Sequence, residues 1–307
     1  MIAQNTIKKT SEVIGIGLHT GKSSRLVFRP APENTGVYFI RKDLIGAPAI
    51  KAVSANVRAT QMATVLGSDD FSISTVEHLM SAVAALGIDN LFVELYGPEI
   101  PIGDGSANPF FQALKRAGKQ AQRAPKKFIY VTKPVYYSQG DKHAYVTPYS
   151  GLKLSVTIDF SHPQIGCQKI DLHVNESTFE RELAQARTFG FLKDVEALRQ
   201  KGLARGGSLE NAVVLDEREI LNPEGLRFSD EFVRHKAMDA IGDLAMLGMP
   251  MLGHVVFHKA GHDVLHGFVE KLLEDQSNFR IIELADSYEV TQAEEEESEI
   301  LYAEALG

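Results

Sequence analysis

The sequence contains very little cysteine: Cys167 is the only one among 307 residues. A single cysteine cannot form an intrachain disulfide, and it excludes a zinc or iron–sulfur site built from several thiolates. The chain also lacks any run of roughly 18 apolar residues, the length that a membrane-spanning helix needs. Its N-terminus, MIAQNTIKKT, has no apolar segment of the kind found in secretory signals. These absences predict a cytoplasmic protein without an integral membrane span.

An excess of positive charge is also missing. The chain has 32 Lys and Arg against 40 Asp and Glu, for a net charge of -8. Binding to nucleic acid depends on clustered positive charge, so we expect no nucleic-acid partner. Hydrophobic residues make up 44% and charged residues 23%, which is typical of a globular protein with a substantial core.

The length and the pattern of elements predict two domains of α+β type. The polar segment Gln120–Lys127, which contains Pro125, separates them, so we expect domains at residues 1–124 and 125–307. Expected strands, which alternate with helices without a regular βαβ rhythm, are Ser24–Phe28, Val37–Ile40, Leu91–Leu95, Phe128–Val135, Leu152–Phe160, Ala212–Leu215 and Val255–His258. Expected helices are 75–86, 108–119, 178–186 (capped by Asn175 or Ser177) and 230–247.

The helix predicted at 230–247 carries a stripe of chemically active residues. His235, Asp239 and Asp243 are spaced i, i+4 and i+8, so they share one face. A histidine and a carboxylate one turn apart can ligate one cation. The alternative is a solvated face with a surface His–Asp pair. Apolar residues on the other faces favour a buried helix, in which charged groups need partners.

The helix predicted at 75–86 begins with Ser74-Thr-Val-Glu77-His78. One interpretation is a capping box, in which Glu77 bonds back to the backbone amide of Ser74. The other is functional, because the positive end of a helix disfavours a charged imidazole and keeps His78 neutral, as a metal ligand must be. An adjacent carboxylate and metal ligand also suit the activation of water.

Four histidines, His254, His258, His262 and His266, recur at intervals of four. They are not a helical metal site, because Val255–Phe257 favours a strand and Gly261 breaks a helix. We expect His262 to lie beside the turn, where catalytic groups are often found. The other three are interpreted as ordinary histidines.

Together these residues predict a metal-dependent hydrolase of amides or esters. His78, His235 and Asp239 would supply three protein ligands and leave a fourth position open, the pattern of a catalytic zinc site. Glu77 is a candidate general base. Asp243 could pair with His262 to form a general acid that also stabilises an oxyanion.

Along almost its whole length the chain resembles the bacterial UDP-3-O-acyl-N-acetylglucosamine deacetylases of lipid A biosynthesis. The matching stretches are Gly15-Ile-Gly-Leu-His-Thr-Gly21, Ser74-Thr-Val-Glu-His-Leu-Met80, Gly87-Ile-Asp-Asn90, Gly103-Asp-Gly-Ser106, Arg187-Thr-Phe-Gly-Phe191, Phe232-Val-Arg-His-Lys-Ala-Met-Asp-Ala-Ile-Gly-Asp243 and Lys259-Ala-Gly-His262. The resemblance implies two similar domains, each a sheet backed by helices, with the active site between them. It implies removal of the N-acetyl group from a 3-hydroxyacylated UDP-N-acetylglucosamine, with release of acetate, by a monomer.

The resemblance also implies roles for individual residues. One zinc ion per chain would be bound by His78, His235 and Asp239, although iron(II) accepts the same ligands. Catalytic roles would fall to Glu77 as base, His262 as acid with Asp243 behind it, and Thr188 at the oxyanion. Substrate contacts would come from Lys236 and Phe189, from Phe160 near the uridine, and, along the acyl chain, from Val195, Ala204, Gly207, Ser208, Ala212 and Val214.

Two alternatives remain at this point. The chain could be a non-catalytic UDP-sugar or lipid-binding protein with a structural metal, but the sequence offers no evident fourth protein ligand. It could be a deacetylase fused to a dehydratase, but 307 residues leave no room for another catalytic domain. The acidic run Glu294–Glu297 is interpreted as a solvated tail or as the exposed face of a terminal helix.

Overall fold

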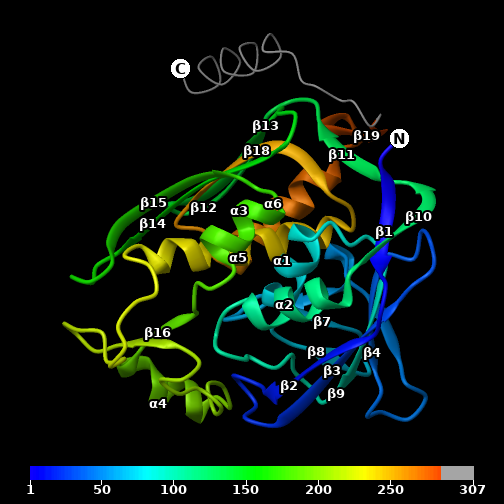
Figure 1. Cartoon of the computed structure of the whole chain (residues 1–307). Helices are drawn as coiled ribbons and strands as arrows, with labels where there is room; N and C mark the ends of the chain where they lie inside the picture. Colours follow the sequence, from blue (N-terminus) through cyan, green and yellow to red (C-terminus); the bar gives the residue numbers. More distant parts are fainter. Residues whose placement is uncertain (285–307) are drawn as a thin grey trace.

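The structure is a computed structural model that describes residues 1–284, so the acidic run Glu294–Glu297 lies outside the described residues. Two mainly antiparallel sheets form outer layers, and helices α1, α2 and α5 lie between them (Figure 1). Each sheet turns its apolar face toward these helices. This arrangement confirms the predicted α+β class.

The first sheet has five strands in the order β2-β3-β9-β4-β5 among the described residues. Its central pair, β4 and β9, is parallel, and side chains of β4 alternate between buried and half-buried. This period of two buries Val37 and Phe39 against the helices. The strands are β2 (Ser11–Ile16), β3 (Ser23–Pro30), β4 (Val37–Arg41), β5 (Ala49–Lys51) and β9 (Leu91–Tyr96).

The second sheet contains seven strands within the described part of the chain, with β18 paired to β11, β13 and β14. The predicted strand Phe128–Val135 is wrong as a single element: it is split at Pro134, which has no N–H for the ladder. The strands are β11 (Lys127–Val131), β12 (Val135–Gln139), β13 (Lys142–Thr147), β14 (Leu152–Phe160), β15 (Gly166–His173), β18 (Met251–His258) and β19 (Phe279–Glu283).

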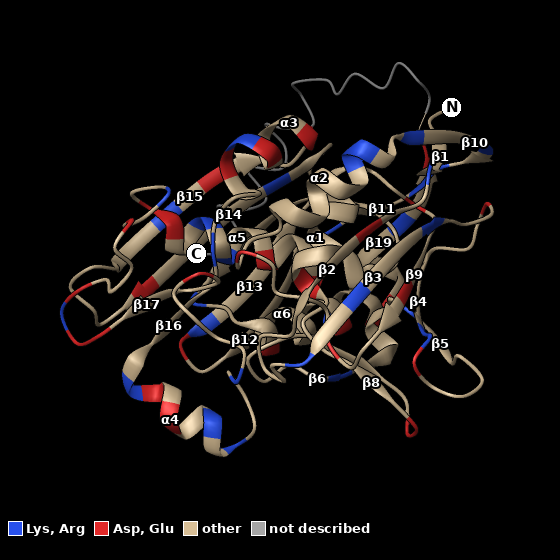
Figure 2. Cartoon of the chain, turned by 60° about the horizontal axis from the view of Figure 1, so that its bottom comes forward, with Lys and Arg blue, Asp and Glu red and all other residues tan. Residues whose placement is uncertain are grey.

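Six α-helices are present within residues 1–284: α1 (Glu77–Ala85), α2 (Asn108–Ala117), α3 (Glu176–Thr178), α4 (Leu192–Gln200), α5 (Glu231–Leu244) and α6 (His262–Glu274). Asn175 caps α3 as predicted, but a π-helical turn replaces the rest of the expected helix 178–186. None of the helices in this part of the chain is long and apolar enough to cross a bilayer. In Figure 2, α4 projects from the body and carries charges of both signs.

The polar segment Gln120–Lys127 is not a loop. It largely coincides with strand β10 (Lys119–Pro125), which pairs antiparallel with β1 (Ala3–Ile7). Sequence patterns did not show this because the partner lies more than 100 residues away and most β10 side chains stay exposed or half-exposed. Since β10 ends at Pro125 and β11 belongs to the second sheet, we propose a domain boundary between residues 124 and 125.

Five short strands complete the described fold. A small sheet on the first half of the chain contains β6 (Val57–Ala59), β7 (Val65–Gly67) and β8 (Ser72–Ile73). In the second half, β16 (Phe189–Phe191) and β17 (Val213–Leu215) form a parallel pair, with α4 in the connection between them. Both small sheets lie next to the candidate site.

Candidate active site

The site exists because α1 and α5 cross in close contact at Gly242. A Cβ atom on Gly242 would lie 2.1 Å from the backbone oxygen of Glu77, which no side chain tolerates. The missing side chain therefore lets the first turn of α1 reach the middle of α5. This contact places His78 beside Asp239, although 161 residues separate them in the sequence.

Three buried side chains converge at this crossing. His78 Nε2 and His235 Nε2 lie 3.5 and 3.4 Å from the same oxygen, Oδ1 of Asp239. One ligand atom from each of the three residues falls within 4.8 Å of the others. Asp239 Oδ1 has no hydrogen-bond partner among the described residues, although it is fully buried. A buried carboxylate oxygen without a partner is costly, so two imidazoles and this oxygen fit a bound divalent cation.

The charge states of the three residues suit a cation. Burial lowers the pKa of His235 to about 3, so its imidazole is neutral. The Nδ1 atom of His235 lies 3.0 Å from the backbone oxygen of Ala186 and donates to it, which leaves Nε2 free to act as a ligand. Burial favours the neutral form of Asp239, but the Lys236 ammonium, 3.0 Å away, holds the pKa of that carboxyl well below its usual value. Asp239 is therefore ionised.

Glu77 does not form the capping box. α1 begins at Glu77 itself, so Val76 occupies the cap position and no side chain caps the helix. The Glu77 carboxylate is instead directed into the site, where Oε2 accepts a hydrogen bond from the Thr64 amide at 3.0 Å. Burial raises the pKa of Glu77 although His262 and His78 oppose the shift. A raised pKa brings a carboxylate closer to the range of an effective general base.

Asp243 and His262 form a hydrogen-bonded pair on the other side of Glu77. His262 is the first residue of α6, directly after the turn at Gly261, as expected, and its Nδ1 lies 2.7 Å from Asp243 Oδ2. Burial alone would lower the pKa of His262, but Asp243 outweighs it and raises that pKa to about 9. The imidazolium therefore persists at neutral pH, with Nε2 3.8 Å from Glu77 Oε1.

These groups share a cavity of about 450 Å³. Eight of the residues singled out in the sequence line it: Glu77, His78, Thr188, Phe189, His235, Lys236, Asp239 and His262. The Lys236 ammonium lies 5.7 Å from the centre of the Phe189 ring and 3.0 Å from Asp239 Oδ2. Phe160 packs edge-on against Phe189, with ring centres 5.6 Å apart. The pair forms an aromatic rim beside a fixed positive charge.

The six residues expected along the acyl chain do not line this cavity. They lie on β17, on α4 and on the loops between β16 and β17: Val195, Ala204, Gly207, Ser208, Ala212 and Val214. The segment that connects β16 to β17 contacts the cavity wall, because the Gly206 amide donates to the backbone oxygen of Leu18 at 2.9 Å. Leu18 lines the cavity, so this connecting segment lies directly beside the site without lining it at these six residues.

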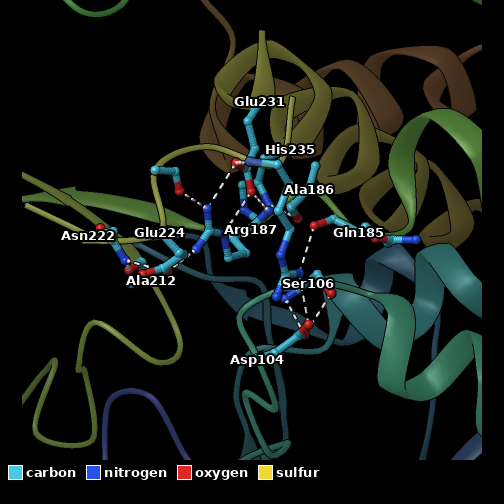
Figure 3. Close-up of polar contacts among 12 residues, drawn as sticks. Asp104, Ser106, Gln185, Ala186, Arg187, Ala212, Asn222, Glu224, Glu231 and His235 are labelled. Carbon is cyan, nitrogen blue, oxygen red and sulfur yellow. Dashed lines mark hydrogen bonds and ion pairs between the residues drawn. The ribbon is translucent and has the colours of Figure 1, made fainter. Parts of the chain in front are cut away.

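The sequence did not predict a buried ion pair that holds the backbone segment between the His235 partner Ala186 and Thr188. The Arg187 guanidinium lies 2.9 Å from Glu231 and 2.6 Å from Glu224, and the Arg187 side chain is 2% exposed (Figure 3). Arg187 stands between Ala186, whose oxygen accepts from His235, and Thr188, which lines the cavity. Its place in the Arg-Thr-Phe-Gly-Phe motif was the only indication of this role.

The sequence also did not predict two sets of buried hydrogen bonds near the cavity. The Thr64 hydroxyl donates to Asp243 Oδ1 at 2.5 Å, so the carboxylate is held from both sides. Glu99, fully buried, accepts hydrogen bonds from the amides of His19 and Thr20 and from the Thr75 hydroxyl, which fixes the loop beside the cavity. His19 Nε2 is buried and has no hydrogen-bond partner within residues 1–284, and burial lowers the pKa of that imidazole. No local pattern marks these long-range contacts.

A buried cation-binding triad, a carboxylate with a raised pKa and an imidazolium in one cavity define a metal-dependent hydrolase. In such a site, one group can take a proton from water and another can give a proton to a leaving group.

Comparison with known proteins identifies the particular family. Residues 4–274 match the family model of LpxC, the UDP-3-O-acyl N-acetylglycosamine deacetylases, so the chain belongs to this family. A UDP-3-O-acyl-N-acetylglucosamine deacetylase of Bdellovibrio bacteriovorus is 57% identical over 92% of this chain and 94% of its own length. Proteins of the same name from Myxococcus xanthus (50% identical; 91% and 89% covered) and Syntrophotalea carbinolica (46%; 94% and 93%) are also similar.

Proposed function

We propose that this chain hydrolyses the acetamide of UDP-3-O-(3-hydroxyacyl)-N-acetylglucosamine and releases acetate and the free amine, the committed step of lipid A biosynthesis. Family membership and relatives of this name at 46–57% identity support the substrate class. The observation that carries the chemistry is the single cavity in which a cation-binding triad adjoins Glu77 and His262.

His78, His235 and Asp239 would hold one zinc ion, and iron(II) is compatible with the same ligands. Bound there, the ion would supply positive charge that polarises the amide carbonyl and acidifies water. The unpartnered Asp239 oxygen and the neutral His235 ring support this assignment. Elemental analysis of protein purified with and without added zinc or iron identifies the metal and its stoichiometry.

The residues of the chain account for the proton transfers. Glu77 takes a proton from the attacking water, which forms the bond to the carbonyl carbon. The Thr188 hydroxyl donates to the oxyanion. His262 then gives its proton to the amide nitrogen as the carbon–nitrogen bond breaks, and Asp243 holds the imidazolium in place. Water and amide thus become acetate and an amine, without an oxidant or a second substrate.

Substrate recognition is assigned to the rim. Lys236 and Phe189, which lie together, contact the substrate, and Phe160, packed against Phe189, contacts the uridine. The acyl chain lies along the segment that connects β16 to β17, beyond Leu18, and contacts the six residues from Val195 to Val214 described above. The proximity of a fixed ammonium, two aromatic rings and a mainly small-residue passage supports this division.

The test is release of acetate from the acylated UDP-N-acetylglucosamine by purified protein, followed by mass spectrometry of the deacetylated product. Stripping the metal with a chelator should abolish release, and adding one equivalent of zinc should restore it. Binding of the substrate without acetate release would overturn the proposal in favour of a non-catalytic binding protein. Unchanged release after complete metal removal would overturn the metal assignment.

A further inference from the structure

A second cavity, of about 550 Å³, lies behind the crossing of α1 and α5, between the two halves of the chain. We call it the Lys126 cavity. Among the described residues, none lines both this cavity and the candidate active site. Its volume is within the range of small-molecule sites, roughly 300–1,000 Å³. The proposed deacetylation uses no residue of this cavity.

One end of the Lys126 cavity is apolar. Its wall is formed by α1, α5 and the segment after α5, and the main contributors are Met80, Val83, Ile241, Leu244, Met249 and Leu252. Ala84, at the end of α1, is exposed, and its small side chain leaves the space open. A hydrocarbon chain placed here would leave water and contact apolar side chains. It would touch the helices that carry Glu77 and Asp239 without entering their cavity.

The other end carries a net positive charge. The Lys126 side chain is 10% exposed, and its ammonium lies 3.1 Å from Asp89 Oδ1 and 3.0 Å from the backbone oxygen of Gly87. An ammonium has three donors, so one donor of Lys126 remains for another acceptor. Asp89 belongs to the Gly87-Ile-Asp-Asn90 motif, which has no part in the proposed reaction.

Lys51 supplies a second positive charge at this end. Its side chain packs over Gly36, whose amide donates to Asn90 Oδ1 at 2.8 Å, so it lies next to the same corner of the chain. Lys51 is half-buried, and no acidic partner is found for it within residues 1–284. With Lys127, which also lines the cavity, three ammonium groups and one carboxylate give the lining a net charge of +2.

We propose that the Lys126 cavity is a binding site for a single-chain anionic amphiphile, with its hydrocarbon chain against α1 and α5 and its anionic head between Lys51 and Lys126. The apolar wall and the polar end match the two parts of such a molecule. The net positive charge of the lining favours an anionic head group over a neutral or cationic one.

Binding is measured by calorimetry on the full chain with three probes that share a 12-carbon chain: laurate, dodecyl phosphate and dodecyltrimethylammonium. Laurate and dodecyl phosphate should each bind with a stoichiometry of one and more tightly than dodecyltrimethylammonium. Because the substrate of the proposed reaction is also acylated, the site is located with a photoactivatable laurate analogue. Crosslinks should map to residues 76–90 or 241–252, not to residues 188–214.

Substitutions test the two ends separately. Lys51→Glu should weaken laurate binding at least about tenfold, the effect of roughly one charge-assisted contact, whereas Lys169→Glu, exposed on β15, should not. Ala84→Phe should weaken binding by a similar factor because the ring fills the cavity, whereas Ala121→Phe, exposed on β10, should not. If Ala84→Phe fails to fold, the comparison of Lys51→Glu with Lys169→Glu and the positions of the crosslinks still test the proposal.

Four results would overturn the proposal: no saturable binding of laurate or dodecyl phosphate, equal or tighter binding of the cationic probe, crosslinks confined to residues 188–214, or unchanged laurate affinity in Lys51→Glu. None of these measurements depends on acetate release. Failure here is therefore distinguishable from failure of the proposed deacetylase activity.

Discussion

Replacing Asp243 with asparagine should move the alkaline limit of activity. The Asp243 carboxylate lies 2.7 Å from His262 Nδ1 and is the main group that opposes burial, which by itself lowers the pKa of the imidazole. With the carboxylate in place that pKa is about 9. Asparagine has nearly the same shape but no charge, so the pKa of His262 should fall to the ordinary value of 6.5 or below.

The size of the effect follows from the two pKa values. If the protonated imidazole is the acid, activity is present below its pKa and is lost as the pH rises through it. At pH 8 about nine-tenths of His262 is protonated with a pKa near 9, but only about 3% with a pKa of 6.5. We therefore expect kcat/KM at pH 8 to fall about 30-fold, and much less at pH 6.

The assay is the pH dependence of kcat/KM for acetate release between pH 5 and 10, with metal content measured in each sample. Thr64→Val is the matched control, because it removes the hydroxyl that donates to Asp243 but leaves the carboxylate charge. Its alkaline limb should stay near that of the unmodified enzyme. An Asp243→Asn enzyme that keeps full metal and an alkaline limb near pH 9 would refute the role of the Asp243–His262 pair.

Three other substitutions test separate features of the site. Glu77→Gln should retain the metal but lower kcat on the order of 10²–10⁴-fold, as for a lost general base. The control Glu270→Gln, on the exposed face of α6, should leave kcat unchanged. A fully active Glu77→Gln enzyme would contradict the base assignment. Arg187→Met leaves Glu231 buried without its charge partner, so the free energy of unfolding in urea should fall by about 3–5 kcal/mol; a loss under about 1 kcal/mol would mean that the pair is dispensable. Gly242→Ala should force α1 away from α5, because the new Cβ would meet the Glu77 backbone at 2.1 Å; competition with a chelator should show weaker metal binding, and unchanged affinity would show that the crossing can relax.

Much of the site could be predicted because its parts are local. His235 and Asp239 are four residues apart on α5, and helical geometry alone places them on one face. The predicted helix 230–247 was expected to stop at Gly248; α5 ends at Leu244, and a 3-10 turn, Ala245–Leu247, continues to Gly248, which adopts a φ of +79° at little cost. The turn before His262 was predictable from Lys259-Ala-Gly261, because glycine disfavours a continuous helix or strand.

Two outcomes that sequence patterns did not predict share one cause. Gln120–Lys127 resembles a loop in sequence, but it pairs as a strand with β1, and Glu77 resembles a capping residue but is directed at Thr64. In both cases a partner distant in the sequence changed the outcome. A local pattern limits what a segment can form, whereas the packing of distant segments selects among the alternatives.

The amino-acid sequence by itself determined the α+β class, the approximate positions of α1, α2 and α5, and the face of α5 that carries His235, Asp239 and Asp243, because backbone hydrogen bonds and side-chain periodicity operate over a few residues. The tertiary structure alone decided that His78 meets Asp239, that Thr64 and Asp243 hold His262, and that a second cavity opens beside Lys126. Those contacts join segments tens to hundreds of residues apart, and they form only where close packing, as at Gly242, brings the segments together.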